Sequence, residues 1–301
     1  EISLGLVGSE MCIRDSCSYC VIPSLRGKYR SRQMDDVLYE ARMLADSGVK
    51  ELIVVAQDTS RYGTDLPGHK RLLPELLRKL CEIDGLHWIR VHYVYPDEID
   101  DEFIQVMASE PKIVKYLDIP IQHCNSKILK LMNRRGDGEF LKALFARLRA
   151  GIPGLVIRTS LITGLPGEGE EEFAELCDFL REQKLLRAGV FPYSPEEGTR
   201  AAKMERVDSD EAARRAERIV DIQSEIIDAW NDERQGDVME VLCEGFDGQS
   251  MLFVGRSYAE SPDIDGRIYF SAPRDVAAGE FVPVRITGAM DGELTGELAE
   301  E

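Results

Sequence analysis

Short apolar runs alternate with amphipathic stretches along roughly the first 200 residues, and this alternation limits the fold more than any other feature. Residues 51–56 (ELIVVA) are apolar enough for a buried strand, and residues 34–47 repeat apolar side chains at helical spacing before Gly48. Strands that alternate with helices form right-handed βαβ units, so the pattern predicts an α/β fold with a mainly parallel sheet. Further strands are expected at 87–94, 113–119, 155–162 and 188–191, and further helices at 72–83, 97–108, 126–133, 139–150 and 170–182.

The pattern changes near residue 235. Residues 208–235 predict a long charged helix, about 40 Å at 1.5 Å per residue. Short β-type runs then follow between Gly, Pro and Asp turns, at 238–243, 251–255, 267–271 and 281–287. This spacing predicts a small antiparallel β-barrel. We therefore divide the chain into a lead-in at 1–16, a catalytic domain at 17–235 that includes the long helix, and an acidic barrel at 236–301.

The charge of the chain is unevenly distributed. Its net charge is −18, and the segment 236–301 alone carries −10, with fourteen Asp or Glu against four Arg and no Lys. Such a surface disfavours general nucleic-acid binding and suits a basic partner. No apolar run approaches the roughly 20 residues that a membrane-spanning helix needs, so we expect no membrane partner.

Seven cysteines are too few and too scattered for a disulfide framework in 301 residues, which indicates a reducing, cytoplasmic location. Only Cys12, Cys17 and Cys20 lie close together in the sequence. Two thiolates at i and i+3 on a loop can hold an iron–sulfur cluster, half of a zinc site, or no metal at all. No second CxxC or paired histidines are present to complete a zinc site. The other four cysteines lie in or beside apolar segments and are expected to be core residues.

Seven motifs follow one another in a characteristic order along residues 17–299. They are CSYCVIPSLRGKYRSR (17–32), QDTSRYG (57–63), RVHYVYP (90–96), YLDIPIQH (116–123), LKLMNRR (129–135), RTSLITGLPGE (158–168) and FPYSPEEGT (191–199). Together they resemble the radical S-adenosylmethionine (SAM) methylthiotransferases. The resemblance implies a transferase with a partial (β/α) radical SAM barrel and a C-terminal small antiparallel β-barrel that is TRAM-like.

The resemblance also implies two cofactors, a [4Fe–4S] cluster held by three cysteines and SAM bound to its fourth iron. One electron would cleave SAM to methionine and a 5′-deoxyadenosyl radical, which abstracts hydrogen before sulfur is inserted and a second SAM supplies the methyl group. Cys17 and Cys20 match the family pattern C-x3-C-x2-C. The first cysteine of that pattern would stand at position 13, where this chain has Ile13, so the neighbouring Cys12 is the candidate for the remaining ligand.

Residues 6–16 (LVGSEMCIRDS) do not resemble the lead-in of the family, and we interpret them as non-native. The family also has an N-terminal domain with a second cluster, which we expect this chain to lack. A chain without that domain is expected to cleave SAM at best, without completing methylthiolation.

The resemblance places SAM at the ends of the strands. The matching positions, which we predict to bind the cofactor, are Tyr19, Gln57, Asp58, Gln122, His123, Arg158, Gly164, Glu168 and Tyr193. Alternatives remain open for several of them: Arg158 could pair with an acidic neighbour, His123 could be structural, and GLPGE could be only a turn before a helix. The sequence assigns no catalytic residue.

Two substrates compete within the family. Relatives that modify tRNA adenosine are expected to carry a basic barrel, because phosphate contacts dominate nucleic-acid affinity. The acidic barrel of this chain favours a basic protein, namely ribosomal protein S-twelve, modified at the β-carbon of an aspartate; tRNA is the alternative. A second alternative is an inactive chain that only binds SAM or the ribosomal protein. The sequence identifies neither the electron donor nor the sulfur donor.

Overall fold

The computed structural model describes residues 2–5 and 17–299. They form two compact units, which divide between Val220 and Asp221, inside helix α8 (Ser209–Glu233). The boundary that we predicted near residue 235 lies at the end of this helix and stays a prediction. The predicted non-native segment, with Cys12, lies outside the described residues.

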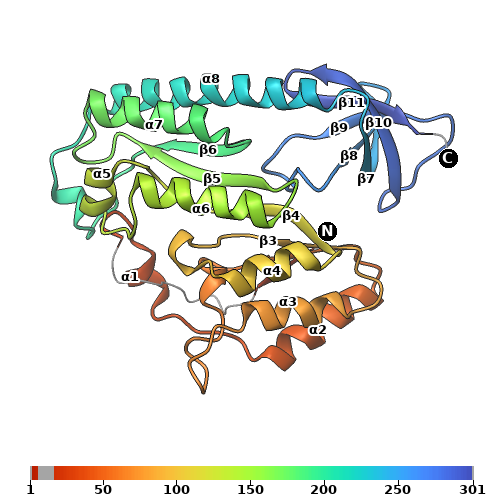
Figure 1. Cartoon of the computed structure of the whole chain (residues 1–301), viewed down its shortest axis with the longest axis horizontal. Helices are drawn as coiled ribbons and strands as arrows, with labels where there is room; N and C mark the ends of the chain where they lie inside the picture. The colour runs from red at the N-terminus through yellow and green to blue at the C-terminus, as the bar shows by residue number, and fades with distance from the viewer. Residues whose placement is uncertain (1, 6–16, 300–301) are drawn as a thin grey trace. The chain divides into compact units, whose positions relative to one another are not determined.

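The first unit contains a sheet of six parallel strands in the order of the chain (Figure 1). The strands are β1 (Ile2–Gly5), β2 (Glu51–Val55), β3 (Trp88–Val91), β4 (Ile113–Asp118), β5 (Val156–Thr163) and β6 (Arg187–Pro192). Each pairs in parallel with the next, as in the register Leu52 to Ile89 between β2 and β3. The predicted α/β fold with a parallel sheet is therefore confirmed.

Helices connect the strands and pack beside one another in chain order, α2 on α3, α3 on α4, α4 on α6 and α6 on α7. Their bounds are α1 (Ile22–Arg26), α2 (Met34–Asp46), α3 (Leu73–Cys81), α4 (Asp101–Ser109), α5 (Ser126–Leu131), α6 (Gly138–Gly151) and α7 (Glu170–Gln183). Because parallel strands all end at one edge, this arrangement gathers the loops after the strands in one place.

Local capping explains where several helices begin. Asp100 and Asp137 each accept a hydrogen bond from the amide three residues later, at the starts of α4 and α6. The helix predicted at 97–108 therefore begins only at Asp101, after a 3-10 turn at Pro96–Glu98. Strand β3 also ends earlier than predicted, since Tyr93 takes a left-handed backbone conformation (φ 55°) that breaks the extended run.

The second unit contains a closed barrel of five strands in the order β10-β11-β9-β8-β7. The strands are β7 (Val238–Asp247), β8 (Leu252–Arg256), β9 (Ile268–Ser271), β10 (Phe281–Met290) and β11 (Glu293–Leu298). Strand β11 was not predicted, and its pairing with β9 is parallel, whereas the other pairs in this barrel are antiparallel.

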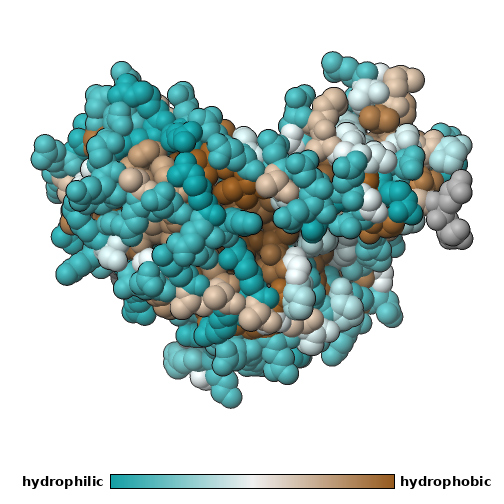
Figure 2. Space-filling model, turned by 45° about the horizontal axis from the view of Figure 1, so that its top comes forward, coloured by the Kyte–Doolittle hydropathy of each residue, from teal (hydrophilic) through white to brown (hydrophobic). Residues whose placement is uncertain are grey.

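The barrel closes around its own apolar core, in which Val241, Ile268, Phe270 and Val284 are fully buried. Trp230, from the last turns of α8, packs against the same core. Hydrophilic residues cover much of the face drawn in Figure 2, in keeping with a chain that is 31% charged. Within the described residues, every helix is too short or too polar to cross a bilayer.

Candidate cofactor site

The two cysteines of the CSYC motif lie on one tight turn, in which the Cys20 amide donates to the Cys17 carbonyl (3.1 Å). Both thiols are partly exposed and neither forms a disulfide. By contrast, Cys124, Cys177 and Cys243 are buried, as predicted for core residues, whereas Cys81, predicted with them, is partly exposed. The turn therefore presents two thiols to a ligand.

Ser18 fixes this turn to the end of helix α5. Its amide donates to the Met132 carbonyl (3.0 Å), and its hydroxyl donates to the Leu131 carbonyl (2.9 Å). The carbonyls at a helix C-terminus have no partner within the helix, so they are free to hold another segment. On the other side, the Ala201 amide donates to the Ser18 carbonyl (2.7 Å). The cysteine turn is thus held from two directions by backbone groups.

Arg134 connects the turn with the ends of two strands. One guanidinium nitrogen donates to the Pro120 carbonyl after β4 (2.6 Å), while the other lies 3.4 Å from the Tyr19 hydroxyl and 3.7 Å from Cys17 Sγ. The guanidinium also lies over the ring of Tyr95, which follows β3, at 5.2 Å from the ring centre. Cys17, Tyr95 and Arg134 line one pocket at this edge of the sheet.

The two tyrosines around Arg134 are uncharged at neutral pH. Burial raises the pKa of Tyr95 to about 12, partly opposed by Arg134. Burial likewise raises the pKa of Tyr19 above its usual range, again partly opposed by Arg134. Their hydroxyls therefore act as neutral hydrogen-bonding groups beside the guanidinium.

An apolar surface lies beside the cysteine turn. Tyr19 and Tyr193, both predicted to bind the cofactor, pack against a buried cluster of Ile128, Met132, Leu165 and Ala201. Ile162, from the end of β5, belongs to the same surface. The structure therefore places Tyr19 and Tyr193 against one apolar surface, beside the ends of β5 and β6, where a flat ring of a ligand could lie.

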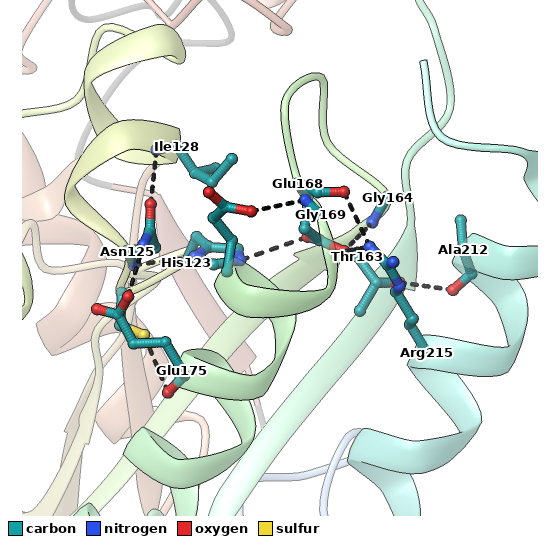
Figure 3. Close-up of polar contacts among 12 residues, drawn as sticks. His123, Asn125, Ile128, Thr163, Gly164, Glu168, Gly169, Glu175, Ala212 and Arg215 are labelled. Atoms are coloured by element: carbon teal, nitrogen blue, oxygen red, sulfur yellow. Dashed lines mark hydrogen bonds and ion pairs between the residues drawn. The ribbon is translucent and has the colours of Figure 1, made fainter.

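Glu168 is held in a buried network rather than exposed to a ligand (Figure 3). Its carboxylate accepts from the Gly164 amide (2.9 Å) and from Arg215 of α8 (2.9 Å). The Asn125 amide donates to His123 Nδ1 (2.9 Å), so the ring carries its proton on Nε2, 3.3 Å from the Glu168 carboxylate. Burial alone would raise the pKa of Glu168, but these hydrogen bonds outweigh it and lower the pKa.

This network holds the GLPGE loop in shape. Gly164 has a φ of 74°, and a Cβ there would lie only 2.4 Å from the Cβ of Ala212. The hydroxyl of Thr163 donates to the Ala212 carbonyl (2.8 Å), which ties the end of β5 to α8. The side chains of His123 and Glu168 thus position the loop, and their predicted role as direct cofactor ligands stays untested.

Arg158 lies within the sheet and pairs with Asp118 of β4 at 3.2 Å. Its neighbour His92, after β3, has its pKa lowered to about 3 by burial and by the charges of Arg90 and Arg158. Arg90 in turn pairs with Glu51 at 2.9 Å, and both side chains are fully buried. The structure therefore places Arg158 in a row of ionic side chains inside the sheet.

The remaining predicted residues differ in exposure. Gln57 is exposed and Gln122 is partly exposed, so both side chains can reach a ligand. Asp58 is fully buried and accepts a hydrogen bond from the Ser60 hydroxyl, which indicates a role in shaping the loop after β2. Gln122 has a left-handed backbone (φ 70°) and bonds through its main chain to β5.

Sequence reasoning missed two arginines that organise the site. Arg134 stands inside the LKLMNRR motif, so the motif was a signal, but nothing in it distinguished Arg134 from Arg135. Arg215 is one of several arginines in a long charged helix, and only the fold shows that its side chain is buried against Glu168.

The described residues fit the cluster that the motifs imply. A [4Fe–4S] cluster takes cysteine thiolates, and Cys17 and Cys20 offer two from one turn, with a guanidinium beside Cys17 to balance negative charge. The predicted third ligand, Cys12, lies outside the described residues.

Comparison with known proteins agrees with this geometry. The family model for the radical SAM superfamily matches residues 6–180, and the TRAM domain model matches residues 236–299. In fold, the chain is similar to coproporphyrinogen III oxidase (HemN) of Escherichia coli, which is a radical SAM enzyme. The TM-score is 0.52 at 18% identity, over 74% of this chain and 52% of that one.

Curated relatives are much more similar in sequence. The ribosomal protein uS12 methylthiotransferase RimO of Acetivibrio thermocellus is 47% identical over 97% of this chain and 64% of its own length. That of Pelotomaculum thermopropionicum is 50% identical over 93% of this chain and again 64% of its own length. The chain thus spans less than two thirds of these relatives. The resemblance predicted from the motifs is confirmed, and the chain belongs to the radical SAM superfamily.

Proposed function

We propose that this chain is the catalytic part of a radical SAM methylthiotransferase. The observation that carries the proposal is the CSYC turn, fixed by backbone bonds at the edge where β3, β4, β5 and β6 end. Cys17 and Cys20, with Cys12 as the third ligand, would hold a [4Fe–4S] cluster there. When bound, the cluster supplies one electron for the reductive cleavage of SAM. The fold match and the curated relatives support these two cofactors.

The residues of the chain itself would bind and orient SAM. Tyr19 and Tyr193 provide an apolar surface for its adenine, and Gln57 and Gln122 are accessible polar groups at the same edge. Glu168 and His123 hold the GLPGE loop in position from behind. A surface built on strand ends is rigid, which suits a reaction that needs close positioning and exclusion of water.

The substrate we propose is ribosomal protein uS12, which the names of the curated relatives contain. The charge of the barrel supports this choice, because a segment at −10 would repel tRNA and attract a basic protein. A cytoplasmic location belongs to the same proposal, supported by six free cysteines among the described residues.

Two assays test this function on the anaerobically reconstituted chain. The first measures 5′-deoxyadenosine formed from SAM under dithionite, in the parent and in Cys20→Ala, with Cys81→Ala as a matched control. We expect the product in the parent and the control and its loss in Cys20→Ala. Equal product in all three, or none in the parent, would refute the proposal.

The second assay addresses the substrate by measuring binding to recombinant uS12 and to tRNA at low and moderate salt. We expect binding to uS12 that weakens as salt rises, since charge attraction is screened. Salt-sensitive binding to tRNA alone would overturn the choice of substrate and favour the tRNA enzymes. Binding to uS12 without SAM cleavage would favour the second alternative, an inactive chain that only binds the ribosomal protein.

A further inference from the structure

Within the described part of the chain, Arg134 is a cation without a carboxylate partner. Its neighbours are the Pro120 carbonyl, the Tyr19 hydroxyl, the Tyr95 ring and the Cys17 sulfur. Among the residues that the structure describes, no Asp or Glu oxygen lies within the 4.0 Å of an ion pair to this guanidinium. A partly buried charge normally has a counter-charge, and of these four groups only the Cys17 sulfur is a proposed ligand of a negatively charged cluster.

The backbone fixes the position of this arginine. Helix α5 ends in a Schellman motif, in which the Asn133 amide donates to the Lys130 carbonyl (3.1 Å) and the Arg134 amide donates to the Leu129 carbonyl (2.8 Å). Asn133 supplies the required left-handed residue, with a φ of 56°. Asparagine is one of the few residues other than glycine that adopts this conformation readily.

The same helix end carries the cysteine turn. The carbonyls of Leu131 and Met132 hold Ser18, and the next residues of the chain carry Arg134 back to Cys17. The backbone of the same helix end therefore holds both the cysteine turn and Arg134. This shared support keeps the Arg134 guanidinium close to Cys17 Sγ. Its neighbour Arg135 points elsewhere, with a side chain that is 74% exposed and 3.8 Å from Asp97.

We propose that Arg134 is a positioning residue that faces the sulfur of Cys17 and raises the reduction potential of the cluster bound there. This inference rests on the proposed cluster of the preceding subsection. Hydrogen bonds to cluster sulfurs and net local charge are two of the factors that set such potentials. Reduction adds a negative charge, and an adjacent cation stabilises the reduced state more than the oxidised state.

The test is the reduction potential of the reconstituted full chain, followed by the EPR signal of the reduced cluster at stepwise dithionite potentials. The variants are Arg134→Gln, Arg134→Lys and, as matched control, Arg135→Gln. We expect about a tenfold lower ratio of reduced to oxidised cluster at fixed potential in Arg134→Gln, equal to about 59 mV for one electron. The potential of Arg134→Lys should lie between those of the parent and Arg134→Gln, because lysine keeps the charge but lacks the planar guanidinium. Arg135→Gln should shift less than either.

The outcomes separate this inference from the proposed function. A parent that binds a cluster whose potential is the same in Arg134→Gln and in Arg134→Lys overturns only the role of Arg134. A parent that takes up no iron overturns both proposals. If Arg134→Gln holds no cluster, the potential of Arg134→Lys is compared with that of the parent. A lower potential in Arg134→Lys supports the inference, and an unchanged potential refutes it. A merely structural arginine would change the cluster content or the stability of the chain instead.

Discussion

Replacing Glu168 by Gln should destabilise the chain far more than the same change at Glu170, although both carboxylates contact Arg215. The Glu168 side chain is fully buried, whereas that of Glu170 is 83% exposed. Removing one partner of a buried ion pair costs about 3–5 kcal/mol. Because Arg215 keeps Glu170 and Glu211 (2.6 and 3.0 Å), we reduce the expected loss for Glu168→Gln to about 2–3 kcal/mol.

The hydrogen-bonding pattern supports this value. The amide oxygen of Gln could still accept from the Gly164 amide and from Arg215, but its NH₂ group would face His123 Nε2. That nitrogen carries the ring proton, because Nδ1 accepts from the Asn125 amide. Two donors would therefore oppose each other in a buried place, which is unfavourable.

Urea unfolding followed by circular dichroism measures the difference directly. Glu170→Gln removes an exposed pair and should change the free energy of unfolding little. The pKa of Glu168 is lowered in the fold, so its stabilisation is present above its unfolded pKa and lost as pH falls through the lowered folded value. The penalty of Glu168→Gln should accordingly shrink under acid conditions. Equal losses in the two variants, at neutral pH, would refute the reasoning.

Three other changes have distinct expected results. His92 has its pKa lowered to about 3, so the unfolded chain binds a proton below about pH 6.5 that the fold rejects, and stability falls on acidification by at most about 1.4 kcal/mol per pH unit. His92→Gln should flatten the dependence of urea midpoint on pH between 6.5 and 4; an unchanged slope would contradict this. Asn133→Val should cost about 1–2 kcal/mol because its backbone is left-handed, and Asn133→Gly should cost little; equal midpoints in urea would show that the helix end is not strained. Gly164→Ala should cost about 1–3 kcal/mol because its Cβ would overlap Ala212, whereas Gly248→Ala meets open space; calorimetry that found equal melting temperatures would exclude the close approach.

Strands β2 to β5 could be predicted because they are buried along most of their length, whereas β1 was not predicted. Strand β2 is apolar after Glu51, and the one charged residue of β3, Arg90, pairs with Glu51 inside the sheet. Strand β11, by contrast, alternates charged, small and apolar residues over only six positions. It becomes a strand because β9 and β10 lie on either side of it, which local sequence does not reveal.

The site was predictable to the extent that its chemistry is local. The CSYC turn is visible in four consecutive residues, and Tyr19 and Tyr193 pack against the same buried cluster beside it. Whether a polar residue faces the ligand or supports a loop depends on distant partners. Asp58 and Glu168 were both predicted to bind the cofactor, but both side chains are buried and hydrogen-bonded inside the protein. Arg134 lies in the LKLMNRR motif, but its position depends on the backbone bonds at the end of helix α5, which the motif alone does not reveal.

Iron and acid-labile sulfide content after anaerobic reconstitution tests the central claim most directly. We predict about four iron per chain in the parent, as a [4Fe–4S] cluster requires, and loss of this iron in Cys17→Ala and in Cys20→Ala. The same measurement on Cys12→Ala decides whether Cys12 is the third ligand. Cys81→Ala serves as the control and should keep its iron. A parent without iron, or iron that survives both replacements in the CSYC turn, would contradict the claim that this turn holds the cluster.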